Sequence, residues 1–227
     1  MKIYAVICTR SKELNPITQG LVAKLSSLPA KVMVMVNQES IFAGYKKAFD
    51  KVDPDDQDIF ILCHDDIEIN ESSTDIINAI SIVNAEGYGF VGVAGTKLLG
   101  VDAVWWNQAR WHQGHHSGQV HHLDKKKGTF YPTYYGQPSK VVAMDGVFLA
   151  ASAKTLRTVG LEKPSYLKGD WDFYDLHYTL TAFEKGLTNV TVLMRLAHHS
   201  SGELVGRKGW EENRRLFIDN HSLPARI

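Results

Sequence analysis

The spacing of apolar residues restricts the fold of this chain more than any other feature of the sequence. Short apolar runs of strand length alternate with stretches in which apolar residues recur every three or four positions. The runs are nearly continuous, which is typical of strands covered on both faces. They occupy residues 2–8, 31–36, 58–63, 89–94, 141–151 and 189–194. Because strands and amphipathic helices alternate, the sequence predicts an α/β fold with a mostly parallel central sheet flanked by helices.

The stretches between the first runs have the apolar pattern of helices that bury one face. In the third of these stretches, Ser72 and Asp75 have the spacing of a capping box. The apolar positions are Leu14, Ile17, Leu21, Leu25 and Leu28 in the first, Ile41, Phe42, Tyr45, Phe49 and Val52 in the second, and Ile76, Ile77, Ile80 and Val83 in the third.

Length and charge limit the number of domains and the kinds of partner. The 227 residues, 44% of them hydrophobic, are enough for one substantial core, so we expect a single domain over residues 1–227. Residues 100–140 are expected to form a long loop or lid with some short strands, and residues 198–227 a C-terminal tail. The 25 basic residues equal the 25 acidic residues, which argues against nucleic acid as a partner.

Targeting signals are also informative. The apolar run at the N-terminus is too short for a signal peptide, and no run of about 18 apolar residues exists that would predict a transmembrane segment. We therefore expect a cytoplasmic protein. Cys8 and Cys63 end apolar runs without a CxxC spacing, and we expect two reduced thiols in the core rather than a disulfide or a zinc pair.

Several well-known site motifs are missing. The first strand is followed by "CTRSKEL", without GxGxxG, and no GxxxxGK[ST] occurs in the chain. These absences argue against a dinucleotide-binding Rossmann enzyme and a P-loop NTPase. GxSxG is also missing, which argues against a serine hydrolase of the nucleophile-elbow type.

A histidine and two aspartates follow the apolar run of residues 58–63. In α/β sheets, ligands collect outside the carboxyl ends of strands. Along an extended segment, His64 and Asp66 would point the same way and Asp65 the opposite way. The pair could hold a divalent cation while a substrate diphosphate supplies further oxygens. The alternative is a turn in which the two aspartates cap the next element.

A second acidic group lies in residues 166–187, where an apolar pattern predicts a helix. Asp172 and Asp175 fall near its N-terminus, where the helix dipole keeps a carboxylate ionised. Such a carboxylate can accept a proton from a substrate hydroxyl. Acidic residues are also common in first helical turns for structural reasons alone. His177 lies about 200° around the helix from Asp175, so both cannot face one site.

A third group follows the last apolar run, in residues 194–210. His198 and His199 could complete a metal site, and Arg207 with Lys208 could neutralise a diphosphate. A solvated loop with incidental histidines is the alternative.

Five more histidines lie close together in the middle of the chain. No cysteine or acidic residue stands at a usual ligand spacing from them, so we expect a partly solvated lid, with an independent zinc site as the alternative. They are His112, His115, His116, His121 and His122.

Taken in order, several segments resemble the GT-A glycosyltransferases, in particular family 2-like bacterial enzymes in which histidine replaces the first Asp of the DxD metal motif. "NQESIFAGYKKAFDKV" is similar to the second strand and its helix, although Lys46 stands where that pattern often has Asn. "DIFILCHDDIEI" resembles the metal strand, and "VVAMDGVFLAA" the strand that lines the donor and acceptor sites. "WDFYDLHYTLTAFEKGL" resembles the helix with the catalytic aspartate, and "AHHSSG" the tail over the diphosphate.

The resemblance implies a GT-A (nucleotide-diphospho-sugar transferase) fold and an inverting transfer from a UDP- or GDP-sugar to a hydroxyl of a carbohydrate or another acceptor. Mn²⁺ or Mg²⁺ would bind to Asp66 and His64, with His198 or His199. Asp175 would be the base. Tyr174 replaces the Glu, and His177 an Asp, of related motifs, so Asp172 stays open as the base.

The resemblance also implies the remaining contacts. Tryptophan rings could stack on the sugar, or could simply pack within the lid. The donor would be bound by Thr9, Arg10, Asn37, Asp65, Asp145, Arg207 and Lys208, and the acceptor by Trp105, Trp106 and Trp111.

Two rival functions stay open at this point. A sugar nucleotidyltransferase or diphosphate hydrolase also needs carboxylates and a divalent cation, but the former usually carries a Gly-rich basic loop that "CTRSKELNP" lacks. The other rival is a carbohydrate-binding module that keeps the transferase fold without turnover.

Overall fold

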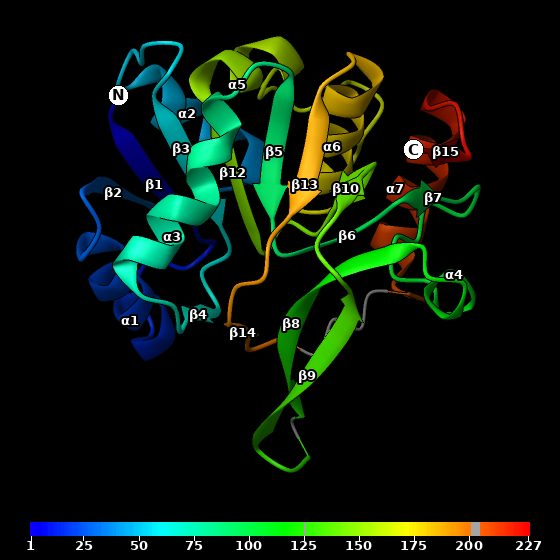
Figure 1. The fold of residues 1–227 in the computed structure, drawn as a ribbon, viewed down its shortest axis with the longest axis horizontal. Helices are drawn as coiled ribbons and strands as arrows, with labels where there is room; N and C mark the ends of the chain where they lie inside the picture. Colours follow the sequence, from blue (N-terminus) through cyan, green and yellow to red (C-terminus); the bar gives the residue numbers. More distant parts are fainter. Residues whose placement is uncertain (125, 201–204) are drawn as a thin grey trace.

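A seven-stranded sheet forms the centre of the molecule, in the order β10-β13-β5-β12-β3-β1-β2 (Figure 1). The structure is a computed structural model that describes residues 1–124, 126–200 and 205–227. Within these residues, β2, β1, β3, β5 and β13 run in one direction, while β10 and β12 are reversed. The prediction of a mostly parallel sheet is therefore confirmed. The strands are β1 (Ile3–Cys8), β2 (Ala30–Met35), β3 (Ile59–Cys63), β5 (Tyr88–Gly92), β10 (Lys140–Val141), β12 (Phe148–Ser152) and β13 (Thr188–Thr191).

The helices begin where polar side chains cap their first turns. Asn15, Ser40, Ser72 and Ser152 each accept a hydrogen bond from a backbone N–H of the helix that follows. Ser72 and Asp75 also bond to each other through their side chains, as the sequence predicts. The helices are α1 (Pro16–Ser26), α2 (Ile41–Asp50), α3 (Ser73–Ile80), the 3₁₀ helix η1 (Ser81–Asn84), α4 (Gln108–His112), α5 (Ala153–Val159), α6 (Tyr174–Glu184) and α7 (Lys208–Asn220).

A second, six-stranded sheet lies at the carboxyl ends of β1 and β3, and it brings distant segments together (Figure 1). Its order is β11-β6-β8-β14-β4, with β9 paired to β8. A short ladder joins the two remaining strands, β7 (Leu98–Leu99) and β15 (Ala225–Arg226). The strands of the second sheet are β4 (Ile67–Ile69), β6 (Ala94–Thr96), β8 (His116–Asp124), β9 (Thr129–Gly136), β11 (Ala143–Met144) and β14 (Leu196–His198).

The segment 100–140 is more regular than the expected loop. It contains α4 and a long antiparallel hairpin of β8 and β9, which are nine and eight residues long. In Figure 1 this hairpin, which we call the arm, extends away from the body of the molecule. The sequence predicts a long loop or a lid with some short strands. The strands are longer than expected because β6 and β14 supply hydrogen-bonding partners for β8 that no local sequence pattern indicates.

The apolar run 141–151 also differs from one continuous strand. It contains the last residue of β10, all of β11 and most of β12, with interruptions at Val142 and around Asp145 and Gly146. Because β11 joins the second sheet and β12 the central one, the interruption around Asp145 and Gly146 lies where the two sheets meet.

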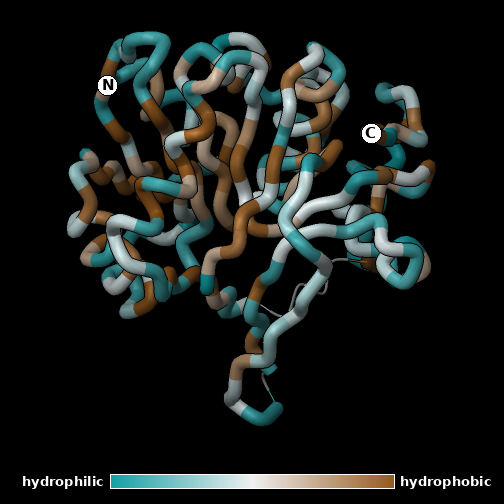
Figure 2. The backbone as a smooth tube through the Cα atoms, viewed as in Figure 1, coloured by the Kyte–Doolittle hydropathy of each residue, from teal (hydrophilic) through white to brown (hydrophobic). Residues whose placement is uncertain are grey.

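Apolar residues concentrate along the central strands (Figure 2). Cys8 and Cys63 are both free and buried there, as predicted, and burial raises the pKa of each thiol to about 12. Over residues 1–124, 126–200 and 205–227, none of the helices has the length and apolar character needed to cross a membrane.

Candidate active site

A cavity of about 760 Å³ opens at the carboxyl ends of β1 and β3, between the central sheet, the arm and α7. Residues from each of the three groups of ionisable side chains predicted from the sequence, after β3, at the start of α6 and after the last apolar run, meet in its wall. All five tryptophans of the chain also line it, namely Trp105, Trp106, Trp111, Trp171 and Trp210. A single cavity therefore combines carboxylates, imidazoles and aromatic rings.

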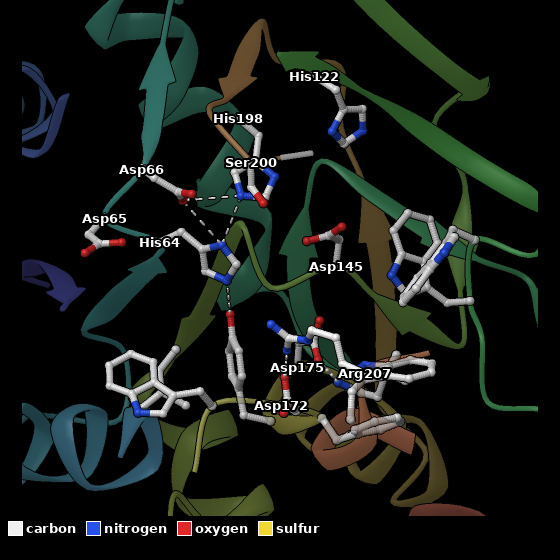
Figure 3. Close-up of a pocket in the computed structure, with 18 of the residues that line it drawn as sticks. His64, Asp65, Asp66, His122, Asp145, Asp172, Asp175, His198, Ser200 and Arg207 are labelled. Atoms are coloured by element: carbon white, nitrogen blue, oxygen red, sulfur yellow. Dashed lines mark hydrogen bonds and ion pairs between the residues drawn. The ribbon is translucent and has the colours of Figure 1, made fainter. Parts of the chain in front are cut away.

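Three candidate metal ligands converge on one side of this cavity (Figure 3). Asp66 Oδ1 lies 3.8 Å from His64 Nδ1 and 3.3 Å from His198 Nε2, and the two ring nitrogens are 3.5 Å apart. Two ligands bound at about 2.1 Å to one ion, at angles of about 90–120°, are separated by roughly 3.0–3.6 Å. The two distances to His198 lie in this range and the His64–Asp66 distance slightly exceeds it, so a small side-chain adjustment would let the three atoms share one divalent cation.

Strand pairing explains why these residues meet. His64 and Asp66 lie between β3 and β4, and β14 runs antiparallel to β4, with His198 opposite Ile67. Side chains two positions apart in an extended chain share a face, so the predicted alignment of His64 with Asp66 is seen.

His199 does not join the three ligands. Its backbone N–H donates to the carbonyl of Asp66, but its ring points to the other face and lies 2.6 Å from Glu68 Oε1. Adjacent residues of a strand face opposite sides, so only one of two consecutive histidines can reach the site. The inclusion of His199 among the candidate ligands is corrected accordingly.

Electrostatics around the three residues favour cation binding. Burial opposes ionisation of Asp66, but the hydrogen bond and charge of His198 outweigh it, so its pKa lies below its ordinary value. Burial and the neighbouring His198 lower the pKa of His64, which favours the neutral, ligating ring. Burial also works against charge on His198, but Asp66 raises the pKa of that ring overall. A cation bound there would displace its proton.

Asp175 lies on another wall of the same cavity, in the first turn of α6. Its Oδ2 accepts from Gly146 N–H at 3.0 Å and its Oδ1 from Leu176 N–H at 2.9 Å. Burial, followed by the charge of Asp145, raises its pKa to about 7. Among the described residues no cationic side chain forms an ion pair with it. It can therefore take up a proton near neutral pH.

Asp172 is placed differently. It precedes α6 instead of lying in the predicted helix, because Phe173 adopts a left-handed conformation (φ 64°) and the helix begins at Tyr174. Phe173 is held there by packing on Trp210 and Phe217. Burial raises the pKa of Asp172, and Arg207, whose Nη2 lies 3.1 Å from Asp172 Oδ1, opposes that effect.

The predicted donor residues divide into two groups. Thr9, Arg10, Asp65, Asp145 and Arg207 line the cavity. Two others do not, and their assignment to the site is corrected. They are Asn37, exposed after β2, and Lys208, exposed at the start of α7.

The guanidinium of Arg10 is fixed by an aromatic ring. Its Cζ lies 4.5 Å from the ring centroid of Trp171, whose Nε1 donates to the carbonyl of Glu39. Figure 3 shows Asp65 on the far side of Asp66 from Asp145.

The predicted tryptophans also have different surroundings. Trp105 is only 2% exposed and packs on His116 and Tyr135, so its face is not free to stack on a ligand. Trp106 packs on Trp210, and Trp111 on Tyr135. All three tryptophans line the cavity, but only Trp106 and Trp111 among them are partly exposed.

The arm contributes cavity residues that sequence reasoning missed. Tyr131, Thr133 and Tyr135 alternate along β9 and face the cavity, and His122 lies opposite Tyr131 on β8. The period-two pattern of "YPTYY" is a signal that could have identified this face. The central histidines do not share one face, because His116 is buried in the core and turned to the carbonyl of Trp105.

Tyr174 is another missed residue. Its hydroxyl lies 2.7 Å from His64 Nε2 and donates to the carbonyl of Gly146 at 2.9 Å. No local sequence signal could have found it, because both contacts depend on tertiary structure.

Comparison with known proteins identifies relatives of the chain. A sequence model described as a glycosyltransferase-like family matches residues 14–221. No curated protein matches the sequence. Among solved structures, the A197 protein from STIV has a TM-score of 0.52 and 12% identity, over 88% of this chain and 87% of that one.

A second similar structure is GalNAc-T7 with UDP, GalNAc and Mn²⁺, with a TM-score of 0.51 and 10% identity. The alignment covers 92% of this chain but 45% of that protein, so the chain spans less than half of its length. At these identities the similarity establishes the fold alone.

Proposed function

The chain belongs to the glycosyltransferase-like family, and from this premise we propose that it transfers a sugar from a nucleoside-diphosphate sugar to an acceptor hydroxyl, with inversion and with a divalent cation. The observation that carries the proposal is the placement of two different sites in one cavity. One is the His64–Asp66–His198 cluster, and the other is the carboxylate of Asp175.

The cation would be Mn²⁺ or Mg²⁺, held by His64 Nδ1, Asp66 Oδ1 and His198 Nε2. Among the described residues, this is the one group of three potential ligands whose atoms all lie within 4.8 Å of one another. When bound, the ion supplies charge stabilisation for a diphosphate leaving group. The Mn²⁺ in the GalNAc-T7 structure supports the choice of metal by analogy.

We assign the general base to Asp175 rather than to Asp172. A base must be unprotonated before reaction and accept a proton near the working pH, and the pKa of Asp175 of about 7 suits that task. The ion pair of Asp172 with Arg207 suits instead a role in holding the loop before α6 or in donor binding. The carboxylate of Asp175 would take the proton of the acceptor hydroxyl as its oxygen attacks the anomeric carbon.

Donor and acceptor would occupy different parts of the cavity. Thr9, Arg10 and Asp65 follow the first and third strands and line the cavity, which supports a nucleotide site on the β1 side. The acceptor, a carbohydrate in this proposal, would lie against Trp111 and Tyr131, whose ring faces suit the apolar faces of a sugar. Two buried reduced cysteines are compatible with a cytoplasmic setting.

Metal-dependent donor binding provides the first test. Calorimetric titration of the wild-type protein with UDP and GDP, each with and without Mn²⁺, should show binding of one nucleotide that depends on the ion. His198→Gln should remove the metal dependence. His199→Gln, which alters the neighbouring ring on the opposite face, is the matched control and should retain it.

Product analysis provides the second test. With a nucleotide-sugar donor, the protein should release free nucleoside diphosphate, and Asp175→Ala should stop transfer while nucleotide binding persists. Release of pyrophosphate would instead indicate a nucleotidyltransferase. Nucleotide binding without turnover over a broad acceptor panel would indicate a binding module.

A further inference from the structure

The hydroxyl of Tyr174 joins the metal cluster to the opposite wall of the cavity. Tyr174 is the first residue of α6 and is 3% exposed. Its oxygen lies 2.7 Å from His64 Nε2 and 2.9 Å from the carbonyl oxygen of Gly146. The hydroxyl therefore has two close partners, one of which can act only as an acceptor.

Proton counting decides the direction of both hydrogen bonds. A tyrosine hydroxyl carries one hydrogen, and a backbone carbonyl has none to give. For both contacts to be hydrogen bonds, the hydrogen of Tyr174 points to Gly146 and the phenolic oxygen accepts from His64. That requires the proton of the neutral His64 ring to be on Nε2, which leaves the lone pair of Nδ1 free.

The free nitrogen is the one that faces the other ligands. His64 Nδ1 lies 3.5 Å from His198 Nε2 and 3.8 Å from Asp66 Oδ1. A ligating histidine binds metal through an unprotonated nitrogen, and the partner of its other nitrogen fixes the tautomer. In the opposite tautomer Nδ1 would carry hydrogen toward the cation and could not bind it.

We propose that Tyr174 is a positioning residue that holds His64 in the Nε2-protonated tautomer and so prepares Nδ1 as a metal ligand. The inference rests on the metal site of the proposed function. It adds Tyr174, which is not itself a ligand, as the residue that controls whether the three ligands can bind the metal ion.

The backbone of Gly146 also orients the proposed base. The carbonyl of Gly146 accepts from Tyr174, while its N–H donates to Asp175 Oδ2 at 3.0 Å. A Cβ at position 146 would overlap the Tyr174 hydroxyl and lie 2.9 Å from Asp175 Cβ. Glycine is therefore required there, and the two peptide groups that flank its Cα link the metal cluster with the base.

The tautomer can be read directly in the metal-free protein. Long-range ¹H–¹⁵N spectra distinguish protonated from unprotonated ring nitrogens, and comparison with His64→Gln assigns the signals. We expect protonated Nε2 and unprotonated Nδ1 for His64 in the wild type. A wild-type ring protonated on Nδ1 alone would overturn the proposal without any need for a variant to fold.

Tyr174→Phe tests the consequence for metal binding. It should abolish the single fixed tautomer and weaken Mn²⁺ binding about 10- to 100-fold, the range found for residues behind metal ligands. The matched control is Tyr178→Phe, one turn along α6, which also loses a buried hydroxyl that donates to a backbone carbonyl, Leu161 O, at 3.0 Å. It should leave both readouts unchanged.

The outcomes separate this inference from the proposed function. Equal Mn²⁺ affinity and an unchanged tautomer in Tyr174→Phe would refute the role of Tyr174, even if the wild type is an active transferase. Equal losses in both tyrosine variants would also refute it, because they would indicate a general packing effect. A wild type with the expected tautomer but no affinity for Mn²⁺ would support the hydrogen-bond assignment and remove the metal-dependent reaction.

Discussion

Replacing Asp175 by Asn should stabilise the protein at neutral and alkaline pH while removing the proposed base. The carboxyl has a pKa of about 7 in the folded protein, against an ordinary value of 3.8, because it is buried and faces Asp145. Between these values the folded state keeps a proton that the unfolded chain has lost. The stability that this proton provides is complete below about pH 4 and is lost as pH rises through about 7.

The size of the effect follows from the difference in pKa. About 3 pH units at about 1.4 kcal/mol each give about 4 kcal/mol of lost stability at pH 8, and about 1–2 kcal/mol at pH 5. Asn cannot ionise and does not suffer this loss. The Asn amide has only one acceptor oxygen, so its NH2 group would face either Leu176 N–H or Gly146 N–H, which are both donors. This mismatch lowers the stability of the variant by an amount that does not vary with pH.

Urea unfolding at a series of pH values, in the presence of a chelator, measures the difference in free energy of unfolding between Asp175→Asn and the wild type. The free energy of unfolding of Asp175→Asn relative to wild type should rise by about 2–3 kcal/mol from pH 5 to pH 8. Asp219→Asn, at an exposed position on α7, is the control and should show no such trend. A difference for Asp175→Asn that is constant over this range would refute the reasoning, because it would mean that the carboxyl ionises normally in the folded state.

Three further predictions concern catalysis, the acceptor and the core. If Asp175 is the base, the turnover rate at saturating substrates should rise tenfold per pH unit below about pH 7 and level off above it, since the carboxyl must be ionised to accept the proton. A turnover rate that is constant from pH 5 to 8, under conditions in which chemistry is rate-limiting, would contradict this. Tyr131→Ala should raise the acceptor KM about two- to tenfold. The control is Tyr134→Ala, which should not raise KM, because Tyr134 lies on the opposite face of the arm although it is similarly exposed (45%, against 48% for Tyr131). Equal increases in KM in both variants would refute stacking of Tyr131 on the acceptor. Asn189→Ala should lower the free energy of unfolding by about 3 kcal/mol in urea titration, because the buried Asn189 side chain bonds three backbone groups that would lose their partner. A loss below about 1 kcal/mol would show that water takes the place of the amide.

Local patterns in the sequence were enough to predict much of the scaffold. Continuous apolar runs mark the buried strands because both faces of the central sheet are covered. The shared direction of His64 and Asp66 follows from the alternation of an extended chain alone. These features depend only on neighbours along the chain.

Other features required the tertiary structure. The strand β8 is stabilised by β6, β9 and β14, and of these only β9 is adjacent in the sequence. The left-handed Phe173 makes the helix begin later than expected, at Tyr174, because α7, far along the chain, supplies the packing that holds Phe173. The choice between His198 and His199 depended on how β14 pairs with β4.

Pairing of β14 with β4 also has a consequence for how the chain matures. His64 and His198 are 134 positions apart, so nearly the whole polypeptide must be made before the last ligand is present. A nascent chain that has emerged only as far as the arm offers His64 and Asp66 without their third partner, and two ligands bind a dication weakly. If the cluster binds a dication as proposed, tight metal uptake would be a late event in biogenesis, and a truncated translation product that lacks His198 would not hold the ion with all three ligands.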